Sequence, residues 1–232
     1  MKSLLPYLIL LLSLTCKLSY AQETNNAIKF VENKGQWHSN ALFKAALKGG
    51  SLYLETNKLT FDLFDTKTFN RYIKAHHEKS SNRNFDSLNF HSYNVEFVGG
   101  NLAPLVAGKY ETSTYYNYFL GNESSKWASN VKGYYQVDYK NIYDGIALSI
   151  YFSDDLKYDL IVSPKANTKD IKLKYNGVDA LSLNKGQLHI KTSVNKIIEE
   201  KPFAYQLIEG EKKEVPCNYT LKNNRIGFEF SD

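Results

Sequence analysis

The chain has 232 residues, with 29 basic and 24 acidic side chains and a formal net charge of +5. A chain of this length holds one large domain or two small ones. The lysines are scattered singly, whereas a nucleic-acid-binding domain concentrates them on one face, so we expect no nucleic acid among the partners. Two cysteines are too few for a disulfide-stapled scaffold.

The N-terminus carries the three parts of a secretory signal. Lys2 is followed by an apolar stretch, Leu4–Cys16, and then by a small-x-small triplet, Ser19–Ala21. This pattern predicts a signal peptide at residues 1–21, with cleavage after Ala21. The apolar stretch is shorter than the roughly 20 residues that cross a bilayer. We therefore expect an exported protein without a transmembrane segment after cleavage.

Cleavage leaves residues 22–232 as the expected mature module, with 27 basic and 24 acidic side chains. Cys217 is then its one cysteine. In a strand-like run a lone cysteine is usually a small buried hydrophobe, and we expect this of Cys217. Lipidation at Cys16 is the alternative to cleavage after Ala21, and it would tether the protein instead of releasing it.

Alternation of apolar and polar residues dominates the rest of the chain. Runs of period two, enriched in β-branched and aromatic residues, indicate half-buried strands. The clearest runs are Lys58–Phe64, His91–Val98, Leu156–Val162, Asp170–Tyr175 and Gln187–Thr192. Turn residues separate such runs, which is typical of sandwiches. The sequence predicts an all-β, antiparallel β-sandwich, either one unit or two packed sandwich-like halves with a sub-boundary near residue 166.

Two stretches depart from this alternation. Thr66–Asn89 is polar, basic and without a clear period, and we expect a long surface loop there. Tyr115–Trp127 does not alternate either, and we expect a short helix or a structured loop. The predicted fold therefore contains one long polar loop and at most one short helix. Gly35 and Gly121 are expected in turn conformations that a Cβ would strain.

Aromatic residues are the strongest functional signal, and five of them fall within Thr114–Trp127. Exposed rings in this segment would bind ligands such as sugars, and the candidate contact residues are Tyr115, Tyr116, Tyr118 and Trp127. Burial of an aromatic ring in the core stabilises the fold by about 1.5–3 kcal/mol. Contact of an exposed ring with a ligand contributes less, ~1 kcal/mol. We therefore interpret Tyr116, Phe119 and Trp127 first as a plug over the sandwich core, and second as a binding platform.

Histidines and acids do not form a recognisable catalytic or metal-binding motif. His76 and His77 are adjacent, whereas zinc ligands are spaced along an element or come from different elements. We expect no metal and no cofactor.

The acidic pairs Asp154–Asp155 and Glu199–Glu200 are adjacent as well, and a glycosidase needs two carboxyls across a cleft. Asp138, Asp144 and Asp159 could converge in space. We assign no catalytic residue and expect that the protein is not an enzyme.

A series of segments in the mature chain carries a family likeness. They are FVENKGQW (30–37), YYNYFLGNESSKW (115–127), YYQVDYKNIYDGIALSIYF (134–152), LKYDLIVSP (156–164), IKLKYNGVDAL (171–181) and EKPFAYQ (200–206). With these segments the chain resembles an N-terminal domain of unknown function of large secreted Bacteroidota proteins. In that family the module precedes propeller-type SBBP repeats, and a C-terminal sorting domain for type IX secretion or gliding-associated display ends the protein.

The resemblance implies export, an extracellular or cell-surface location, and no catalytic residues. The sequence ends at Asp232 without a sorting domain, so a truncated or stand-alone copy and a periplasmic location are also expected as alternatives. The first hypothesis is a non-catalytic structural or adhesion module whose partners are other domains or surface proteins. The second is a carbohydrate-binding module that uses exposed aromatics to bind glycans. The third is a hydrolase with an unrecognised carboxylate site.

Overall fold

The structure is a computed structural model that describes residues 8–15, 28–77 and 87–231 and, within these, the side chains of all but residues 11–15 and 75–77. Several predictions therefore fall outside the described part, namely cleavage after Ala21, lipidation of Cys16, and the side chains of His76 and His77. The described residues form eighteen strands, one α-helix and two 3₁₀ turns.

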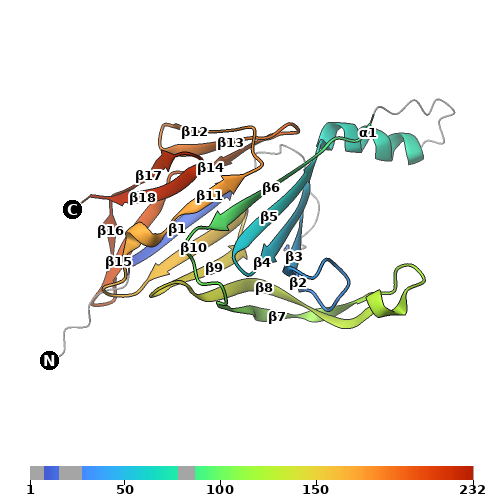
Figure 1. Cartoon of the computed structure of the whole chain (residues 1–232), viewed down its shortest axis with the longest axis horizontal. Helices are drawn as coiled ribbons and strands as arrows, with labels where there is room; N and C mark the ends of the chain where they lie inside the picture. The colour runs from blue at the N-terminus through green and yellow to red at the C-terminus, as the bar shows by residue number, and fades with distance from the viewer. Residues whose placement is uncertain (1–7, 16–27, 78–86, 232) are drawn as a thin grey trace.

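The strands pair antiparallel and form one continuous sheet that folds into two layers (Figure 1). The first layer contains, in spatial order, β7 (Leu105–Tyr118), β8 (Ala128–Tyr143), β9 (Ile146–Phe152), β10 (Leu156–Val162), β1 (Leu8–Thr15), β15 (Phe203–Ile208) and β16 (Glu211–Val215). From the other end of β1 the same layer continues into β14 (Lys196–Glu199), β13 (Gln187–Lys191) and β12 (Ala180–Asn184).

The second layer contains β2 (Phe30–Glu32), β3 (Ala41–Leu47), β4 (Gly50–Glu55), β5 (Lys58–Phe64), β6 (Phe90–Phe97), β11 (Leu173–Asn176), β18 (Arg225–Phe230) and β17 (Cys217–Lys222). β2 also pairs with β8, which joins the two layers. The predicted all-β antiparallel sandwich is confirmed.

Alternate residues of both layers fill the hydrophobic core. β10 buries every second residue from Leu156 to Val162, and β5 buries every second residue from Leu59 to Leu63. Both strands have the bounds that the period-two pattern predicts. Cys217 lies in this core as expected, and burial raises the pKa of its thiol to about 12. The thiol therefore stays protonated and unreactive at neutral pH.

The sub-boundary expected near Ala166 falls between β10 and β11. β11 pairs with β6 on one side and with β18 on the other. Ile171 and Tyr175 belong to the same hydrophobic cluster as Phe61 and Leu148. Residues on the two sides of Ala166 therefore contribute to a shared core.

A buried carboxylate links the two layers at the end of β14. Glu199 accepts hydrogen bonds from the hydroxyls of Tyr158 at 2.7 Å and Tyr175 at 2.6 Å, and the hydroxyl of Tyr219 lies at 3.5 Å. Tyr158 belongs to the first layer, whereas Tyr175 and Tyr219 belong to the second. Burial raises the pKa of Glu199 above its ordinary value, and the tyrosine hydroxyls counteract this shift.

The segment predicted as a long polar loop is in part a helix, α1 (Thr66–His77), so that prediction is wrong for these residues. Asp65 caps the helix: its carboxylate accepts from the backbone N–H of Lys67 at 2.9 Å and from the Thr68 hydroxyl at 2.7 Å. The rings of Phe64 and Phe69 pack with centroids 4.5 Å apart, which forms a hydrophobic staple across the cap. In the described ranges, no helix is both long and apolar enough for a membrane span.

Part of the expected signal peptide is a strand of the first layer. Leu8–Thr15 forms β1, which lies between β10 on one side and β15 and β14 on the other. Leu10 is fully buried. Residues Leu8–Thr15 of the apolar N-terminal stretch therefore lie inside the sheet in this structure.

Candidate functional site

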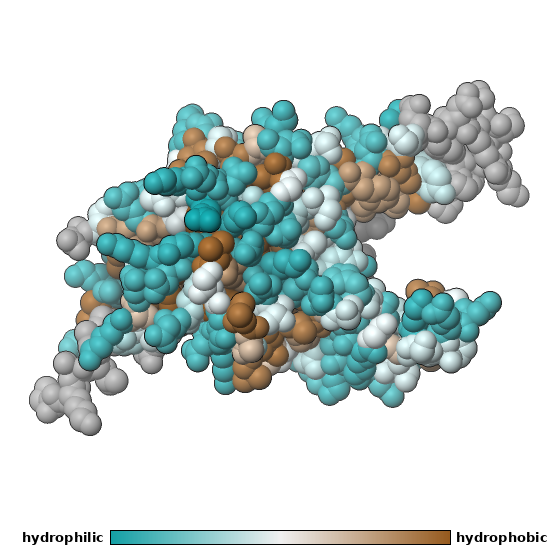
Figure 2. Space-filling view, in the orientation of Figure 1, coloured by the Kyte–Doolittle hydropathy of each residue, from teal (hydrophilic) through white to brown (hydrophobic). Residues whose placement is uncertain are grey.

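The hairpin of β7 and β8 extends beyond the rest of the sheet (Figure 1). β9 pairs with β8 from Gln136 onward, and β2 pairs with it at Gly133 and Tyr134. Residues 111–132 are named the hairpin arm. Within the described ranges, the strand residues of the arm from Tyr115 to Lys132 pair only with one another. The arm and α1 extend from the same end of the molecule, and Figure 2 shows a recess between them.

Apolar side chains are exposed at the end of the hairpin arm, near the 3₁₀ turn η1 (Ser124–Lys126). The exposed fractions are 62% for Tyr115, 59% for Phe119, 76% for Leu120 and 45% for Trp127. The rings of Phe119 and Trp127 meet edge to face, with centroids 5.8 Å apart. The indole Nε1 of Trp127 donates to a backbone carbonyl 3.2 Å away, so its polar atom is satisfied and its exposed surface is apolar.

The interpretation of these rings as a core plug is therefore wrong for Phe119 and Trp127. The reason is topological: in the described part of the chain the hairpin arm extends past β2 and β9, so an opposing layer does not cover its end. Tyr116 is half-buried. The predicted turn conformations of Gly35 and Gly121 are confirmed, with φ of 105° and 71°.

Tyr116 and Tyr118 begin a row of rings on one face of the arm. Their centroids are 6.4 Å apart, and Trp37 meets Tyr118 edge to face at 5.5 Å. All three rings are half-buried. Burial raises the pKa of the Tyr118 hydroxyl, which therefore stays protonated.

The row continues onto the outer face of β3 and β4. The Nζ of Lys44 lies 5.4 Å from the ring centroid of Trp37 and 5.2 Å from that of Tyr53. The ring of His38 lies 5.0 Å from that of Tyr53. A lysine ammonium within about 6 Å of a ring centroid makes a cation–π contact. Tyr116, Tyr118, Trp37, Lys44 and Tyr53 together are named the aromatic row.

The loop after β2 positions Trp37 for this row. Asn33 closes the loop, because its Nδ2 donates to the carbonyls of His38 at 2.9 Å and Ala41 at 2.8 Å. Its Oδ1 accepts from the backbone N–H of Gly35 at 3.0 Å and of Trp37 at 3.2 Å. Asn favours such side-chain-to-backbone bonds in turns. The NKGQW motif therefore folds around one amide side chain.

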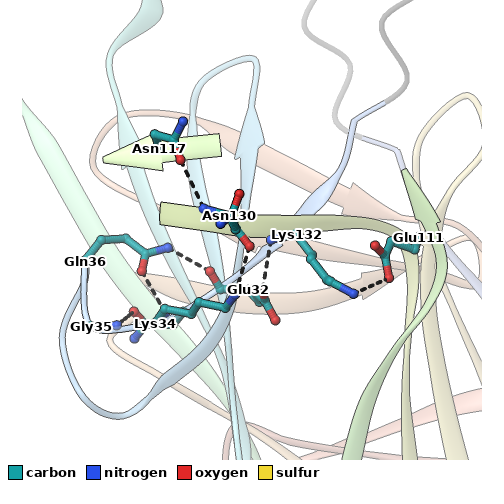
Figure 3. Close-up of polar contacts among 9 residues, drawn as sticks. Glu32, Lys34, Gly35, Gln36, Glu111, Asn117, Asn130 and Lys132 are labelled. Atoms are coloured by element: carbon teal, nitrogen blue, oxygen red, sulfur yellow. Dashed lines mark hydrogen bonds and ion pairs between the residues drawn. The ribbon is translucent and has the colours of Figure 1, made fainter. Parts of the chain in front are cut away.

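Charged side chains join this loop to the hairpin arm (Figure 3). Glu32 Oε1 accepts from the backbone N–H of Lys132 at 2.8 Å, and Lys132 Nζ donates to Glu111 at 2.9 Å. Lys34 Nζ lies 3.1 Å from Glu32 and donates to the carbonyl of Asn130 at 2.8 Å. Exposed ion pairs contribute little energy individually. The bonds from Glu32 to the N–H of Lys132 and from Lys34 to the carbonyl of Asn130 connect β2 and its loop to the arm, whereas the Lys132–Glu111 pair links the two strands of the arm.

Two glycines allow rings and strands to approach closely at the base of the arm. A Cβ on Gly108 would lie 2.4 Å from the ring of Tyr134, and one on Gly133 would lie 2.9 Å from the hydroxyl of Thr112. Tyr110 has φ of 56° beside a register shift of β7. A left-handed tyrosine is unusual, and here it precedes the shift of register between Glu111 and Tyr115.

Of the three acids that could converge, Asp138 and Asp159 lie on neighbouring parts of the sheet. Asp138 and Asp159 are both in register with Ser149, on the strands that flank β9. Ser149 donates to Asp138 at 2.8 Å, and Tyr151 contacts both Asp159 oxygens at 3.3 Å. Burial raises the pKa of Asp159 to about 6. Asp144 lies apart, in the turn between β8 and β9.

The pair Asp154 and Asp155 lines a pocket of about 90 Å³ together with Lys48 and several apolar side chains. Both acids come from the single turn between β9 and β10, so they do not supply carboxyls from two walls of a cleft. Among the residues with described side chains, no group of three metal-ligating side chains gathers.

The comparison with known families adds a classification. The family described as Domain of unknown function (DUF7948) matches residues 30–232. The chain belongs to this family. The matched part begins at the first residue of β2 and includes the loop, the hairpin arm and every strand of the two layers except β1, so the site described above lies within the DUF7948 domain. Searches of curated proteins and of solved structures found no match.

Sequence reasoning found the rings of this site but missed its connections. It named Tyr115, Tyr116, Tyr118 and Trp127, which the structure divides into an exposed pair and a half-buried pair. It did not find Lys44, Tyr53 or the contacts of Glu32. The Glu32–Lys132 bond spans 100 residues of sequence, and no local pattern signals such a pairing.

Proposed function

We propose that the DUF7948 domain of this chain is a non-catalytic recognition module with a structural or adhesive role, and that the hairpin arm is its contact surface. The observation that carries this proposal is the exposure of Phe119, Leu120 and Trp127 at the end of a projecting hairpin. Large apolar side chains gathered in one exposed place favour a partner that covers them.

The support beneath the arm favours the same function. The Trp37–Tyr118 contact of the aromatic row and the bonds of Glu32 to Lys132 and of Lys34 to Asn130 connect the arm to β2 and its loop. A preorganised surface loses less conformational entropy on binding. The buried or paired acids support a non-catalytic role: Glu199 is held by tyrosine hydroxyls, and Asp159 by Tyr151.

The expected signal peptide and the resemblance to N-terminal domains of large secreted Bacteroidota proteins support the setting of this proposal. We infer that the module acts outside the inner membrane, in a surface protein of the kind that carries SBBP repeats and a type IX or gliding-associated sorting domain. Its partners are then other domains or surface proteins, with the periplasm as the alternative location.

Site-specific photo-crosslinking in the native host tests the contact surface. A photo-reactive phenylalanine in place of Phe119 is expected to form adducts with a discrete partner. The matched control places it at Ile208, another exposed apolar position, in the β15–β16 hairpin away from the arm (Figure 1). Adducts at the arm and not at Ile208 support the proposal. Equal adducts at both positions, or adducts only at Ile208, contradict it.

Glycan binding is the second candidate, because the indole N–H of Trp127 is already satisfied and its exposed ring offers an apolar face. Rings of this kind pack against the apolar faces of sugars. A glycan array probed with the wild-type protein and with Trp127→Ala distinguishes the candidates. Glycan signals that Trp127→Ala abolishes without unfolding the protein favour a carbohydrate-binding module over a protein-binding one.

A further inference from the structure

The most unusual feature of the fold is the position of β1, whose sequence is also the apolar part of the expected signal peptide. Residues Leu8–Leu14 pair with Leu156–Val162 of β10. On its other side, β1 pairs with β15 at Leu8–Leu11 and with β14 at Leu14 and Thr15. β1 is antiparallel to all three strands. Because it has a neighbour on each side, it is an interior strand of the first layer.

The position of β1 requires aliphatic side chains at alternate places. Leu10 is fully buried, and it is in register with Leu160 of β10 and Ala204 of β15, which are 0% and 1% exposed. Leu8 packs against the same core. Ile9 is half-buried on the opposite face, in register with Tyr205 of β15.

Removal of β1 would change the sheet in a defined way. β10 would keep β9 as a neighbour, and β15 would keep β16, but the edges that now face β1 would lose their ladder partner. Exposed ladder edges readily take up another strand. The DUF7948 match starts at Phe30, so β1 lies outside the family region while β10, β14 and β15 lie inside it.

The mature residues offer no evident replacement for β1. The strands β2 to β18 already pair with one another in the two layers. The segments outside the described residues that would remain after cleavage, QETNNA (22–27) and EKSSNRNFD (78–86), are mostly polar. The same holds for these residues in a second copy of the chain, which favours a replacement strand from outside residues 22–232.

We infer that signal cleavage opens a strand-acceptor slot between β10 and β15, and that an apolar strand of a partner protein fills it. The incoming strand runs antiparallel to β10 and β15 and places aliphatic side chains at the positions of Leu8 and Leu10. This is recognition by β-strand addition, with main-chain hydrogen bonds for affinity and alternate side-chain pockets for specificity. The inference rests on the expected export and cleavage, but not on the hairpin arm.

The test starts from the full chain, so that β1 is present during folding. A specific protease site introduced within residues 22–27 allows cleavage after folding. The cut protein is then incubated with labelled peptides that contain residues 8–15 flanked by lysines for solubility. Three peptides are compared: the wild-type sequence, one with Leu10→Thr and one with Ile9→Thr. Both substitutions make the same chemical change, but on opposite faces of the strand.

The wild-type peptide and the Ile9→Thr peptide are expected to exchange into the cut protein at one per chain and to raise its unfolding temperature. The Leu10→Thr peptide is expected to bind at least about tenfold more weakly, because it places a hydroxyl between Leu160 and Ala204. Absence of uptake, or equal uptake of all three peptides, overturns the inference.

Mass spectrometry of the protein recovered from its host tests the premise separately. An N-terminus at Gln22 supports the inference. Retention of residues 8–15 overturns it, because β1 is then a permanent strand of the domain. Neither outcome depends on crosslinking at Phe119, so failure of the slot and failure of the hairpin-arm function are distinguishable.

Discussion

The hydroxyl of Tyr175 donates a 2.6 Å hydrogen bond to Glu199 and thereby joins the two layers of the sandwich. Tyr175 lies on β11 and Glu199 on β14, and both are buried. Removal of one partner from a buried, charged hydrogen bond costs about 1–3 kcal/mol. Tyr175→Phe is therefore expected to lower the free energy of unfolding by this amount in urea denaturation. Tyr115→Phe, which removes an exposed hydroxyl, should change it by less than about 0.5 kcal/mol, and equal effects would contradict this role.

The raised pKa of Glu199 predicts a pH dependence of stability. Because burial raises its folded-state pKa above 4.5, the folded protein binds more protons than the unfolded chain between pH 4.5 and that raised value. Stability therefore falls as the pH rises through this window, by at most about 1.4 kcal/mol for each pH unit that the window spans. Glu199→Gln is expected to flatten the curve of unfolding free energy measured from pH 4 to pH 8.

Asp159 contributes a second, separable part of this dependence. Burial raises its pKa from 3.8 to about 6, so its contribution to stability is lost as the pH rises across that interval. Asp159→Asn should remove this part of the curve and leave the part due to Glu199. A wild-type curve that rises with pH over the same range would contradict both assignments.

The contact between Gly108 and Tyr134 predicts a steric effect at the base of the arm. A Cβ at Gly108 would lie 2.4 Å from the ring, so either the ring or β7 has to move. Gly108→Ala is expected to destabilise the protein by about 1–3 kcal/mol. Ser113→Ala, at an exposed position of the same strand, serves as the control. The double variant with Tyr134→Leu should recover part of the loss, and a loss that persists unchanged would exclude the ring as its cause.

The bonds of Asn33 predict how the loop supports Trp37. Asn33→Ala removes four hydrogen bonds within the loop and is expected to cost about 1–3 kcal/mol. In a Trp127→Phe background, Trp37 fluorescence should become easier to quench with acrylamide. Asn40→Ala, at an exposed position of the same loop, is the matched control. Unchanged quenching in the Asn33 variant would mean that the contacts with Tyr118 and Lys44 hold Trp37 without the loop bonds.

The sandwich was predictable because apolar and polar residues alternate within many of its strands, and this alternation is visible in the sequence. β5 and β10 bury alternate residues over their full predicted lengths, and period two requires no knowledge of the partner strand. α1 was not predicted, although Asp65 and the Phe64–Phe69 staple are local signals of a helix start. The polar composition of the segment outweighed them.

The candidate site was predictable only as a set of rings. Whether a ring is core or surface depends on which strands cover it, and the hairpin arm projects beyond β2 and β9. The carboxylate of Glu32 reaches the arm through a tertiary contact, and the cation of Lys44 reaches Trp37, whose ring packs against Tyr118 of the arm. The role of Glu199 was hidden for the same reason, since its tyrosine partners come from three different strands.

The proposal that the end of the arm is a recognition surface is tested most directly with the double variant Phe119→Ala/Trp127→Ala. A photo-reactive phenylalanine in place of Tyr115 reports partner contact in both backgrounds. We expect an unfolding temperature within about 2 °C of wild type, because these rings are exposed, and at least about a tenfold loss of adducts. A fall of more than about 8 °C would place the rings in the fold, and an unchanged adduct yield would remove the arm from the contact surface.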